Sequence, residues 1–296
     1  MTALAPTSRV WNLERADFAA AVHWTLRIGA AACFIGHGVF GLIGKEGWLP
    51  YFAFFGIGPE LAWQLMPVIG VIDITLGVIT ILRPMPAILL HFAFWGLMTA
   101  LLRPLTGEPL WEAWERSGNW VVPLALLLLL GPVRRPLRWW FSALTVPRLD
   151  RVTADRVARP LRIGTALLLI GHGAFGALMH KASWFDYFAT IGVGEATVGS
   201  RHLLAVVGWF EITLGIAVLA APTVGVLVVV IAWKLGTELL RPLSGEPIWE
   251  FIERGGSYAA PMALLLVTWW RRLHHELDVA SPARLEASDE LARSAA

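Results

Sequence analysis

The chain has 296 residues and a formal net charge of +2 at pH 7; 56% of its residues are hydrophobic and 16% are charged. This composition, with a mean hydropathy of +0.62 and 16 tryptophans, lies outside the range of a soluble domain of this length and indicates a membrane protein with the lipid bilayer as its partner. The small net charge gives no reason to expect a nucleic-acid partner, and the single cysteine, Cys33, excludes an intrachain disulfide and a thiol redox pair.

The first predicted unit begins after a segment, residues 1–21, that mixes charged and apolar side chains and predicts a retained interfacial helix rather than a cleaved signal. Apolar stretches without strand-like alternation then predict four helices. They cover about residues 22–43, 61–82, 85–103 and 118–133. The last is short for a hydrocarbon core of about 30 Å, so it either crosses a thinned bilayer or extends a helix that begins near Trp111.

The second predicted unit follows a linker, residues 134–159, in which tryptophans beside arginines predict an amphipathic helix on the cytoplasmic surface. Four further apolar stretches and a polar tail complete the chain. The helices cover about residues 160–179, 202–220, 222–241 and 256–271, and the tail covers residues 273–296.

Three ordered matches show that the two units are similar. LRIGAAACFIGHGVFG from Leu26 returns as LRIGTALLLIGHGAFG from Leu161, DITLG returns as EITLG, and LLRPLTGEPLWEAWER returns as LLRPLSGEPIWEFIER. They predict a tandem duplication with repeats at residues 22–133 and 160–272. Because each repeat has an even number of spans, we expect an all-α polytopic membrane bundle of two parallel four-helix repeats, about eight transmembrane helices, related by a pseudo-two-fold axis.

The basic residues predict the orientation. Arg9, Arg15 and Arg27 precede or open the first helix, and arginines crowd the linker and the tail. Since cytoplasmic loops are rich in Lys and Arg, we expect a multi-pass protein of the cell membrane with both termini in the cytoplasm. Both Gly-Glu-Pro motifs then face outward.

Matching ionisable residues inside the spans are the candidate catalytic residues. His37 and His172 each lie between two glycines, and Asp73 and Glu211 occupy matching places near mid-depth of the second helix of each repeat. A rise of about 1.5 Å per residue puts each histidine within about two turns of its acid. Such pairs relay protons to a quinone, or the histidines meet at the axis and ligate a haem b iron, or each pair only ties two helices together. No spacing is diagnostic of another metal.

Two further sets of residues are candidate substrate ligands. The outward motifs carry acids and arginines that form either an entrance over the bundle, able to hold an anionic substrate, or an aromatic belt with structural ion pairs. These residues are Arg103, Glu108 and Glu112, matched by Arg241, Glu246 and Glu250. The second set is asymmetric: Lys234 and Glu238 stand where the first repeat has Gly96 and Ala100. The pair either neutralises itself or identifies the second repeat as the working one, with His91 as the only ionisable residue that the first repeat adds on the matching helix.

These features resemble the DoxX-like superfamily. The resemblance rests on Leu-Arg at the start of the first helix, a glycine-rich helix ending near Lys45 or Lys181, an acid followed four residues later by glycine, and four spans per unit. It implies a four-helix membrane module; some relatives are membrane subunits of a thiosulfate:quinone oxidoreductase or accompany enzymes of oxidant defence. This chain differs because it is duplicated.

The leading functional hypothesis is a membrane component of a redox system that binds quinone or haem between the repeats. The sequence has no Gly-x-Gly-x-x-Gly loop after a strand and no thiol pair, so the electron donor is expected to be a redox partner protein or a small molecule. The alternatives are a small-solute transporter or channel, with the same groups along its path, and a non-catalytic membrane scaffold.

Overall fold

The computed structural model describes residues 8–131, 136–146, 149–193 and 200–279, and throughout these ranges the secondary structure is helical, with no strand. We refer to residues 8–131 as the first half and residues 149–279 as the second half. The long helices of the first half are α1 (Ser8–Ile43), α3 (Pro59–Leu82), α4 (Pro86–Leu105) and α6 (Ser117–Leu129). Those of the second half are α8 (Arg151–Ala177), α10 (Ser200–Ala220), α11 (Val224–Leu243) and α13 (Gly255–Val279).

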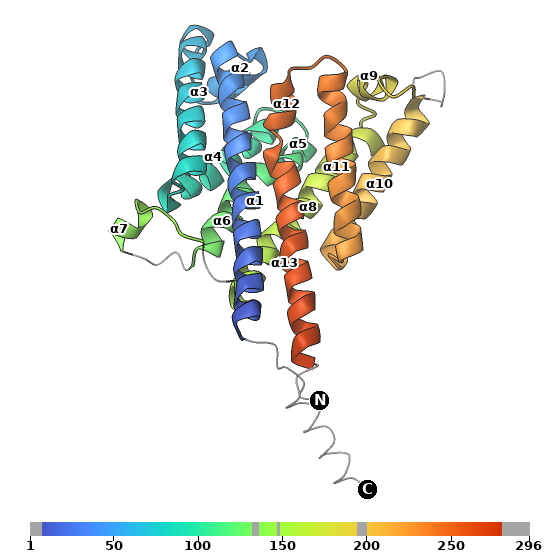
Figure 1. Cartoon of the computed structure of the whole chain (residues 1–296). Coiled ribbons are helices and arrows are strands. Elements are labelled where there is room, and N and C mark those ends of the chain that lie inside the picture. The colour runs from blue at the N-terminus through green and yellow to red at the C-terminus, as the bar shows by residue number, and fades with distance from the viewer. Residues whose placement is uncertain (1–7, 132–135, 147–148, 194–199, 280–296) are drawn as a thin grey trace, which may run out of the picture.

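Short helices lie at the two ends of the bundle (Figure 1). They are η1 (Glu46–Trp48), α2 (Leu49–Phe54), α5 (Leu110–Glu115), α7 (Leu137–Trp140), α9 (Ser183–Ala189) and α12 (Ile248–Ile252). In Figure 1, α2, α5, α9 and α12 lie toward the upper end, whereas α7 and the end of α13 lie toward the lower end.

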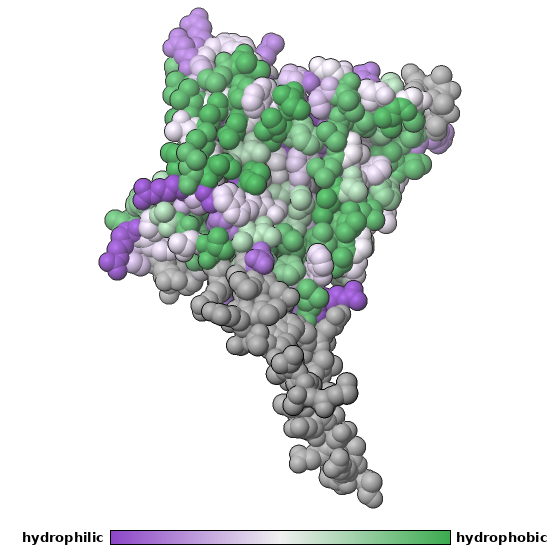
Figure 2. All heavy atoms as spheres, viewed as in Figure 1, coloured by the Kyte–Doolittle hydropathy of each residue, from purple (hydrophilic) through white to green (hydrophobic). Residues whose placement is uncertain are grey.

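Four helices of the described chain are long and apolar enough to cross a membrane. They are α1 over Asp17–Ile43, α3, α4, and α10 over His202–Ala220. The other described helices do not meet the same requirements of length and apolar composition. Figure 2 shows hydrophobic residues over much of the wall of the bundle, with hydrophilic residues gathered near its upper and lower rims. The described chain is therefore helical with an apolar outer wall, as a membrane protein requires.

Two segment boundaries differ from the sequence-based expectation. The predicted interfacial segment is the start of α1, which runs unbroken from Ser8 because no glycine or proline interrupts residues 8–28. Within the predicted linker, only α7 and the first residues of α8 are helical. Helix α8 begins at Arg151 because the Asp150 side chain accepts a hydrogen bond from the Thr153 backbone N–H at 2.7 Å, a standard N-cap. The tail beyond Val279 lies outside the described residues.

The last helix of each half is broken rather than extended as one rod. Arg116 separates α5 from α6, and Glu253 and Arg254 separate α12 from α13. Helix α6 has 13 residues, or about 20 Å, which is less than a bilayer core. The motif glycines Gly107 and Gly245 have φ of 96° and 99°, so each turn before the short helix requires a residue without a side chain.

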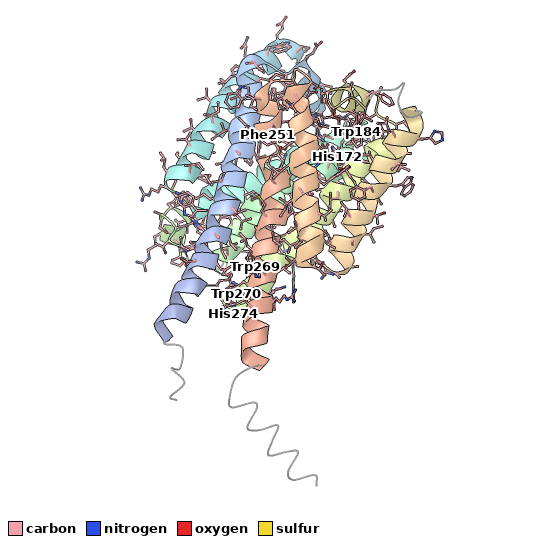
Figure 3. The ribbon with its side chains drawn as sticks, turned by 45° about the vertical axis from the view of Figure 1, so that its right-hand side comes forward. His172, Trp184, Phe251, Trp269, Trp270 and His274 are labelled. Atoms are coloured by element: carbon pink, nitrogen blue, oxygen red, sulfur yellow. The ribbon has the colours of Figure 1, made fainter. Side chains whose placement is uncertain are left out.

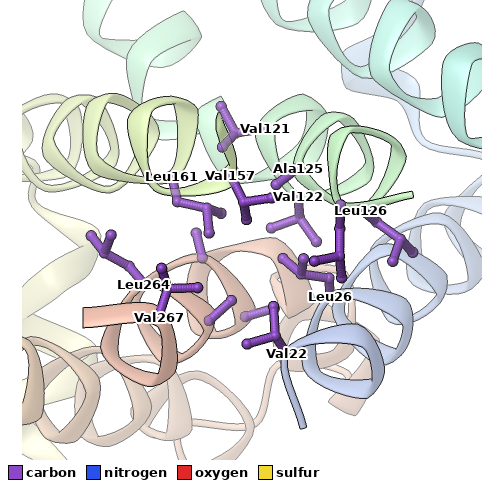
Figure 4. Packing of buried hydrophobic residues seen from close by; sticks show 14 of the residues in the cluster. Val22, Leu26, Val121, Val122, Ala125, Leu126, Val157, Leu161, Leu264 and Val267 are labelled. Atoms are coloured by element: carbon purple, nitrogen blue, oxygen red, sulfur yellow. The ribbon is translucent and has the colours of Figure 1, made fainter. Parts of the chain in front are cut away.

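The core joins the halves through helices α1, α6, α8 and α13. Figure 4 shows buried aliphatic side chains from all four meeting in one cluster, among them Leu26, Val122, Leu161 and Leu264. The backbones of α6 and α13 touch at Gly118, where an added Cβ would lie 2.6 Å from the carbonyl carbon of Gly256. Because α1 packs against α12 and α13, and α8 packs against α5 and α6, the first helix of each half packs on the broken helix of the other.

Candidate functional site

The Gly-His-Gly sequences lie where three helices come together. A Cβ added to Gly38 would lie 2.6 Å from the Gly70 carbonyl oxygen of α3, and one added to Gly36 would lie 2.5 Å from the Glu253 backbone nitrogen beside α12. The glycines therefore allow backbone to approach α1 on both sides of His37. In the second half, Gly171 and Gly173 make the matching close approaches to the first half's Glu115 and to Gly208.

In the second half the predicted histidine–carboxylate pair is present. The Nδ1 atom of His172 lies 2.6 Å from the Glu211 carboxylate, which also accepts a hydrogen bond from the Trp233 indole at 2.7 Å. The His172 ring stacks on Trp184 with 4.8 Å between ring centres, as Figure 3 shows near the upper end of the bundle. These partners hold the histidine firmly between α8, α9 and α10.

A second buried carboxylate in this half, that of Glu238, is surrounded by basic side chains. Glu238 contacts the Lys234 ammonium at 2.7 Å, the Nε of Arg241 at 2.8 Å and the Nε of Arg254 at 3.0 Å. Lys234 is 0% exposed and Glu238 is 2% exposed. With these side chains in place, the cavity beside His172 measures only about 20 Å³. Lys234 and Glu238 thus form the self-neutralising pair, and they occupy the volume that a ligand would need.

In the first half the predicted pair does not form. The Nδ1 atom of His37 lies 3.0 Å from the Cys33 carbonyl oxygen, and its Nε2 lies 3.9 Å from the carboxylate of Glu253 in the other half. Asp73 is 5% exposed, and no described residue gives it a hydrogen bond or an ion pair. Its side chain is one methylene shorter than that of Glu211, so the carboxyl group stops short of the histidine.

The first half instead contains a cavity of about 300 Å³ between helices α1 to α4. Three replacements explain why it is open here and filled in the second half: Asp73 for Glu211, Gly96 for Lys234 and Ala100 for Glu238. Its walls are mainly aromatic and aliphatic, including Phe34, Trp48, Phe52, Phe55, Leu65, Met66, Ile69, Trp95, Met98 and Leu102. Its polar lining residues are His37, Tyr51, Asp73, Thr99, Arg103, Arg116 and Asn119.

A small polar pocket of about 60 Å³ adjoins this cavity at the end nearest α5 and α12. His37, Trp48, Arg103, Arg116 and Asn119 line both spaces. The remaining walls come from the ion pairs of both halves. The His37 imidazole therefore lies between an apolar space and a charged one.

The two Gly-Glu-Pro motifs, which are the outward motifs of the sequence-based prediction, form ion pairs between their acids and arginines. Arg103 contacts Glu108 at 2.9 Å and Glu112 at 3.6 Å, and Arg116 contacts Glu112 at 2.5 Å and Glu115 at 2.8 Å. Tyr51 donates a hydrogen bond to Glu108. Burial raises the pKa of Tyr51 to about 12. Burial also opposes ionisation of Glu115, but the neighbouring Arg116 charge outweighs it and holds the Glu115 pKa well below its usual value.

The second half repeats these contacts. Arg241 lies 3.4 Å from Glu246, whose carboxylate also accepts a hydrogen bond from Tyr187 at 2.5 Å. Arg254 lies 2.7 Å from Glu250. Although burial opposes ionisation, the charges of Arg254 and Lys45 hold the pKa of Glu250 at about 2.

Two ion pairs between the halves tie the outward motifs together. Lys45 of the first half contacts Glu250 at 3.3 Å, and Lys181 of the second half lies 3.9 Å from Glu112. These acids are thus partners of basic residues at the bundle end, and Glu250 also lines the polar pocket.

Two sequence-based hypotheses gain no support from this geometry. His37 and His172 line different cavities, and the backbones of Gly118 and Gly256 meet at the contact between the halves. Lys234 and Glu238 pair with each other, and only a small cavity remains beside Glu238. His91 lies apart, in a groove between α4 and α7.

Comparison of the chain with protein-family models, with characterised proteins and with solved structures gave no match. The DoxX-like resemblance therefore remains a prediction. What the chain does has to be inferred from the cavity and the groups around it.

Proposed function

We propose that the chain is a DoxX-like, multi-pass protein of the cell membrane that binds a quinone in the first-half cavity, as the membrane component of a redox system. In this proposal it consists of two tandem four-helix repeats with eight spans, and both termini are cytoplasmic. The observation that carries the function is the apolar, aromatic-lined cavity with an unpartnered carboxyl group and a histidine in its wall.

Repeated contacts support the duplication. The guanidinium of Arg27 donates to the Thr80 carbonyl at 2.9 Å near the end of α3, and that of Arg162 donates to the Val218 carbonyl at 3.2 Å near the end of α10. In both cases the arginine of the Leu-Arg motif satisfies carbonyls that a helix end leaves without partners. The motif is thus explained by one helix-capping role used twice.

The size of the cavity supports a small-molecule ligand. A volume of about 300 Å³ lies at the lower end of the range for ligand sites. Apolar space of this size is costly to leave unfilled, because the side chains around it lose packing contacts. A bound molecule removes most of this cost, and flat rings between Trp48 and Trp95 suit aromatic walls.

The polar groups suit quinone chemistry. Reduction of a quinone to a quinol takes up two electrons and two protons, so a site for it needs groups that move protons. Asp73 and His37 line the cavity, and His37 also borders the polar pocket next to Glu253. An unpaired carboxylate in apolar surroundings is costly, so Asp73 requires a proton or a hydrogen bond from the ligand. The electrons come from a redox partner protein or a small molecule.

The transporter alternative is less well supported. A polar solute needs a hydrated route, whereas the described contact between the halves is a packed cluster of aliphatic side chains from α1, α6, α8 and α13 (Figure 4). The largest described cavity of the site region lies within one half and is mostly apolar.

The test is quinone binding by the whole chain in mild detergent. Menadione (2-methyl-1,4-naphthoquinone) should quench the fluorescence of Trp48 and Trp95, and lipid extracts of the purified protein should contain quinone. Asp73→Asn and His37→Gln should weaken binding about tenfold, the loss of one good hydrogen bond. The matched control is His172→Gln, which lies in the half whose cavity is filled. Absence of both co-purified quinone and saturable quenching would refute the proposal.

A further inference from the structure

The carboxylate of Glu238 occupies a specific position in the second half. Three cationic side chains hold it: Lys234, Arg241 and Arg254, at 2.7, 2.8 and 3.0 Å. The Nε2 atom of His172 lies 3.8 Å away. Any group in this position must therefore be an anion or a strong hydrogen-bond acceptor.

The first half has the two arginines of this receptor but neither its lysine nor its carboxylate, because Gly96 replaces Lys234 and Ala100 replaces Glu238. Arg103 and Arg116, the counterparts of Arg241 and Arg254, use their Nη1 atoms to contact the acids of α5 and the preceding turn. Their Nε donors, which in the second half bind Glu238, have no partner among the described residues. The Arg116 side chain is 21% exposed against 13% for Arg254.

These donors line the ligand cavity. Arg103, Arg116 and His37 all border both the cavity of about 300 Å³ and the polar pocket beside it. The apolar walls contributed by Trp48, Phe52 and Trp95 belong to the same cavity. A molecule that fills it thus meets aromatic surfaces along its body and two guanidinium groups at one end.

We infer that the ligand of the first half carries an anionic oxygen, which Arg103 and Arg116 bind in the position that the Glu238 carboxylate takes in the second half. Given the proposed quinone function, on which this inference rests, the ligand class is a hydroxyquinone whose acidic ring hydroxyl is ionised at neutral pH. The Glu238 carboxylate then takes, in the second half, the position that the anionic group of the ligand takes in the first half. Since Lys234 has no counterpart, the first half holds this group with two guanidinium donors rather than three cations.

The test compares two quinones of nearly equal size in the whole chain. The anionic probe is 2-hydroxy-1,4-naphthoquinone, and the neutral probe is menadione. The wild-type chain should bind the anionic probe at least about tenfold more tightly, the effect of one charge-assisted hydrogen bond. Arg103→Gln and Arg116→Gln should each bring this ratio close to one. Arg241→Gln, the matched change in the filled half, should leave it unchanged.

Each outcome decides a different point. Equal binding of both probes by the wild-type chain, or an equal loss of both in Arg103→Gln, would overturn the inference while leaving the quinone proposal standing. Binding of neither probe would remove the quinone proposal, and this inference with it. If the arginine variants fail to fold, Ala100→Glu replaces them, since it keeps both arginines and supplies the carboxylate; loss of the anionic probe alone is then the supporting result.

Discussion

Replacement of Ala100 by glutamate should give the first half the carboxylate that Glu238 supplies in the second half. Ala100 is 2% exposed and lies one turn before Arg103 on α4, as Glu238 lies one turn before Arg241 on α11. The new carboxylate should accept hydrogen bonds from the Nε atoms of Arg103 and Arg116. The corresponding distances in the second half are 2.8 and 3.0 Å.

The expected magnitude follows from these two bonds. A hydrogen bond to a charged group contributes about 1.5–3 kcal/mol, and burying the carboxylate removes part of that gain. The free energy of unfolding of Ala100→Glu should therefore be about 1–3 kcal/mol higher than that of Ala100→Gln, whose side chain has the same size without the charge. Affinity for 2-hydroxy-1,4-naphthoquinone should fall at least about a hundredfold in Ala100→Glu, because the tethered carboxylate competes at an effective concentration in the millimolar range or above.

The measurements are denaturation of both variants in the same detergent and titration of the quinone by tryptophan quenching. A glutamate variant less stable than the glutamine variant would show that the two arginine donors do not converge near residue 100. Unchanged quinone affinity in Ala100→Glu would show that the ligand does not use the position of the Glu238 carboxylate. Either result contradicts the comparison of the halves.

Four further substitutions test the fold by thermal unfolding in detergent. Gly118→Ala should lower stability by about 1–3 kcal/mol, because the new methyl group meets the Gly256 backbone at 2.6 Å. The control Gly236→Ala, where an added Cβ has nothing within 4 Å, should instead raise stability by about 0.5–1 kcal/mol. Equal effects of the two substitutions would refute the close contact of α6 with α13. Arg27→Gln should cost about 2 kcal/mol, since the guanidinium donates to two carbonyls at the end of α3; a neutral result would deny it a capping role. Asp150→Ala should cost about 1 kcal/mol at pH 7. The hydrogen bond from the Thr153 N–H lowers the pKa of Asp150, so this stabilisation is present above the unfolded pKa of about 4 and is lost as the pH falls through the lowered folded value. A difference between wild type and Asp150→Ala that persists at acid pH would contradict this.

Local features of the site could be predicted from the sequence. The glycines beside His37 and His172 indicated close approach of another backbone, and the structure has such contacts on both sides of each histidine. The spacing of acids and arginines in the outward motifs indicated ion pairs, and the structure contains them. The ion pairs could be predicted because they join residues close together in the sequence, and the close approaches because flanking glycines let a backbone from either half come near.

The partner of His37 could not be predicted in this way. Counting residues along helices placed it near Asp73, but its charged neighbour is Glu253 of the other half. The reason is that α1 packs on α12 and α13, so the contact depends on how the halves associate. A difference of one methylene between Asp73 and Glu211 also decides whether a carboxylate reaches the histidine, and no periodicity in the sequence reports that distance.

The charged pair on α11 was misleading for a physical reason. An ionisable residue inside a membrane bundle usually indicates function because burying it alone is costly. Lys234 and Glu238 avoid this cost because Glu238 pairs with Lys234, Arg241 and Arg254. Their burial therefore needs no ligand or catalytic role to explain it. In this chain the informative residues are the small ones in the matching positions: Gly96 lines the cavity, and neither Gly96 nor Ala100 has a side chain large enough to fill it.

The filled half nevertheless contributes to the site of the open half. Glu253 lies 3.9 Å from His37, and Glu250 holds Lys45, so the second half supplies part of the polar pocket beside the cavity. The close contact of Gly36 with the Glu253 backbone fixes α1, and therefore His37, relative to that pocket. A first half on its own would keep its apolar cavity, but His37 would lose its charged neighbour Glu253. Under the proposed function, the described second half therefore completes the proton route of the first half, whose cavity binds the ligand.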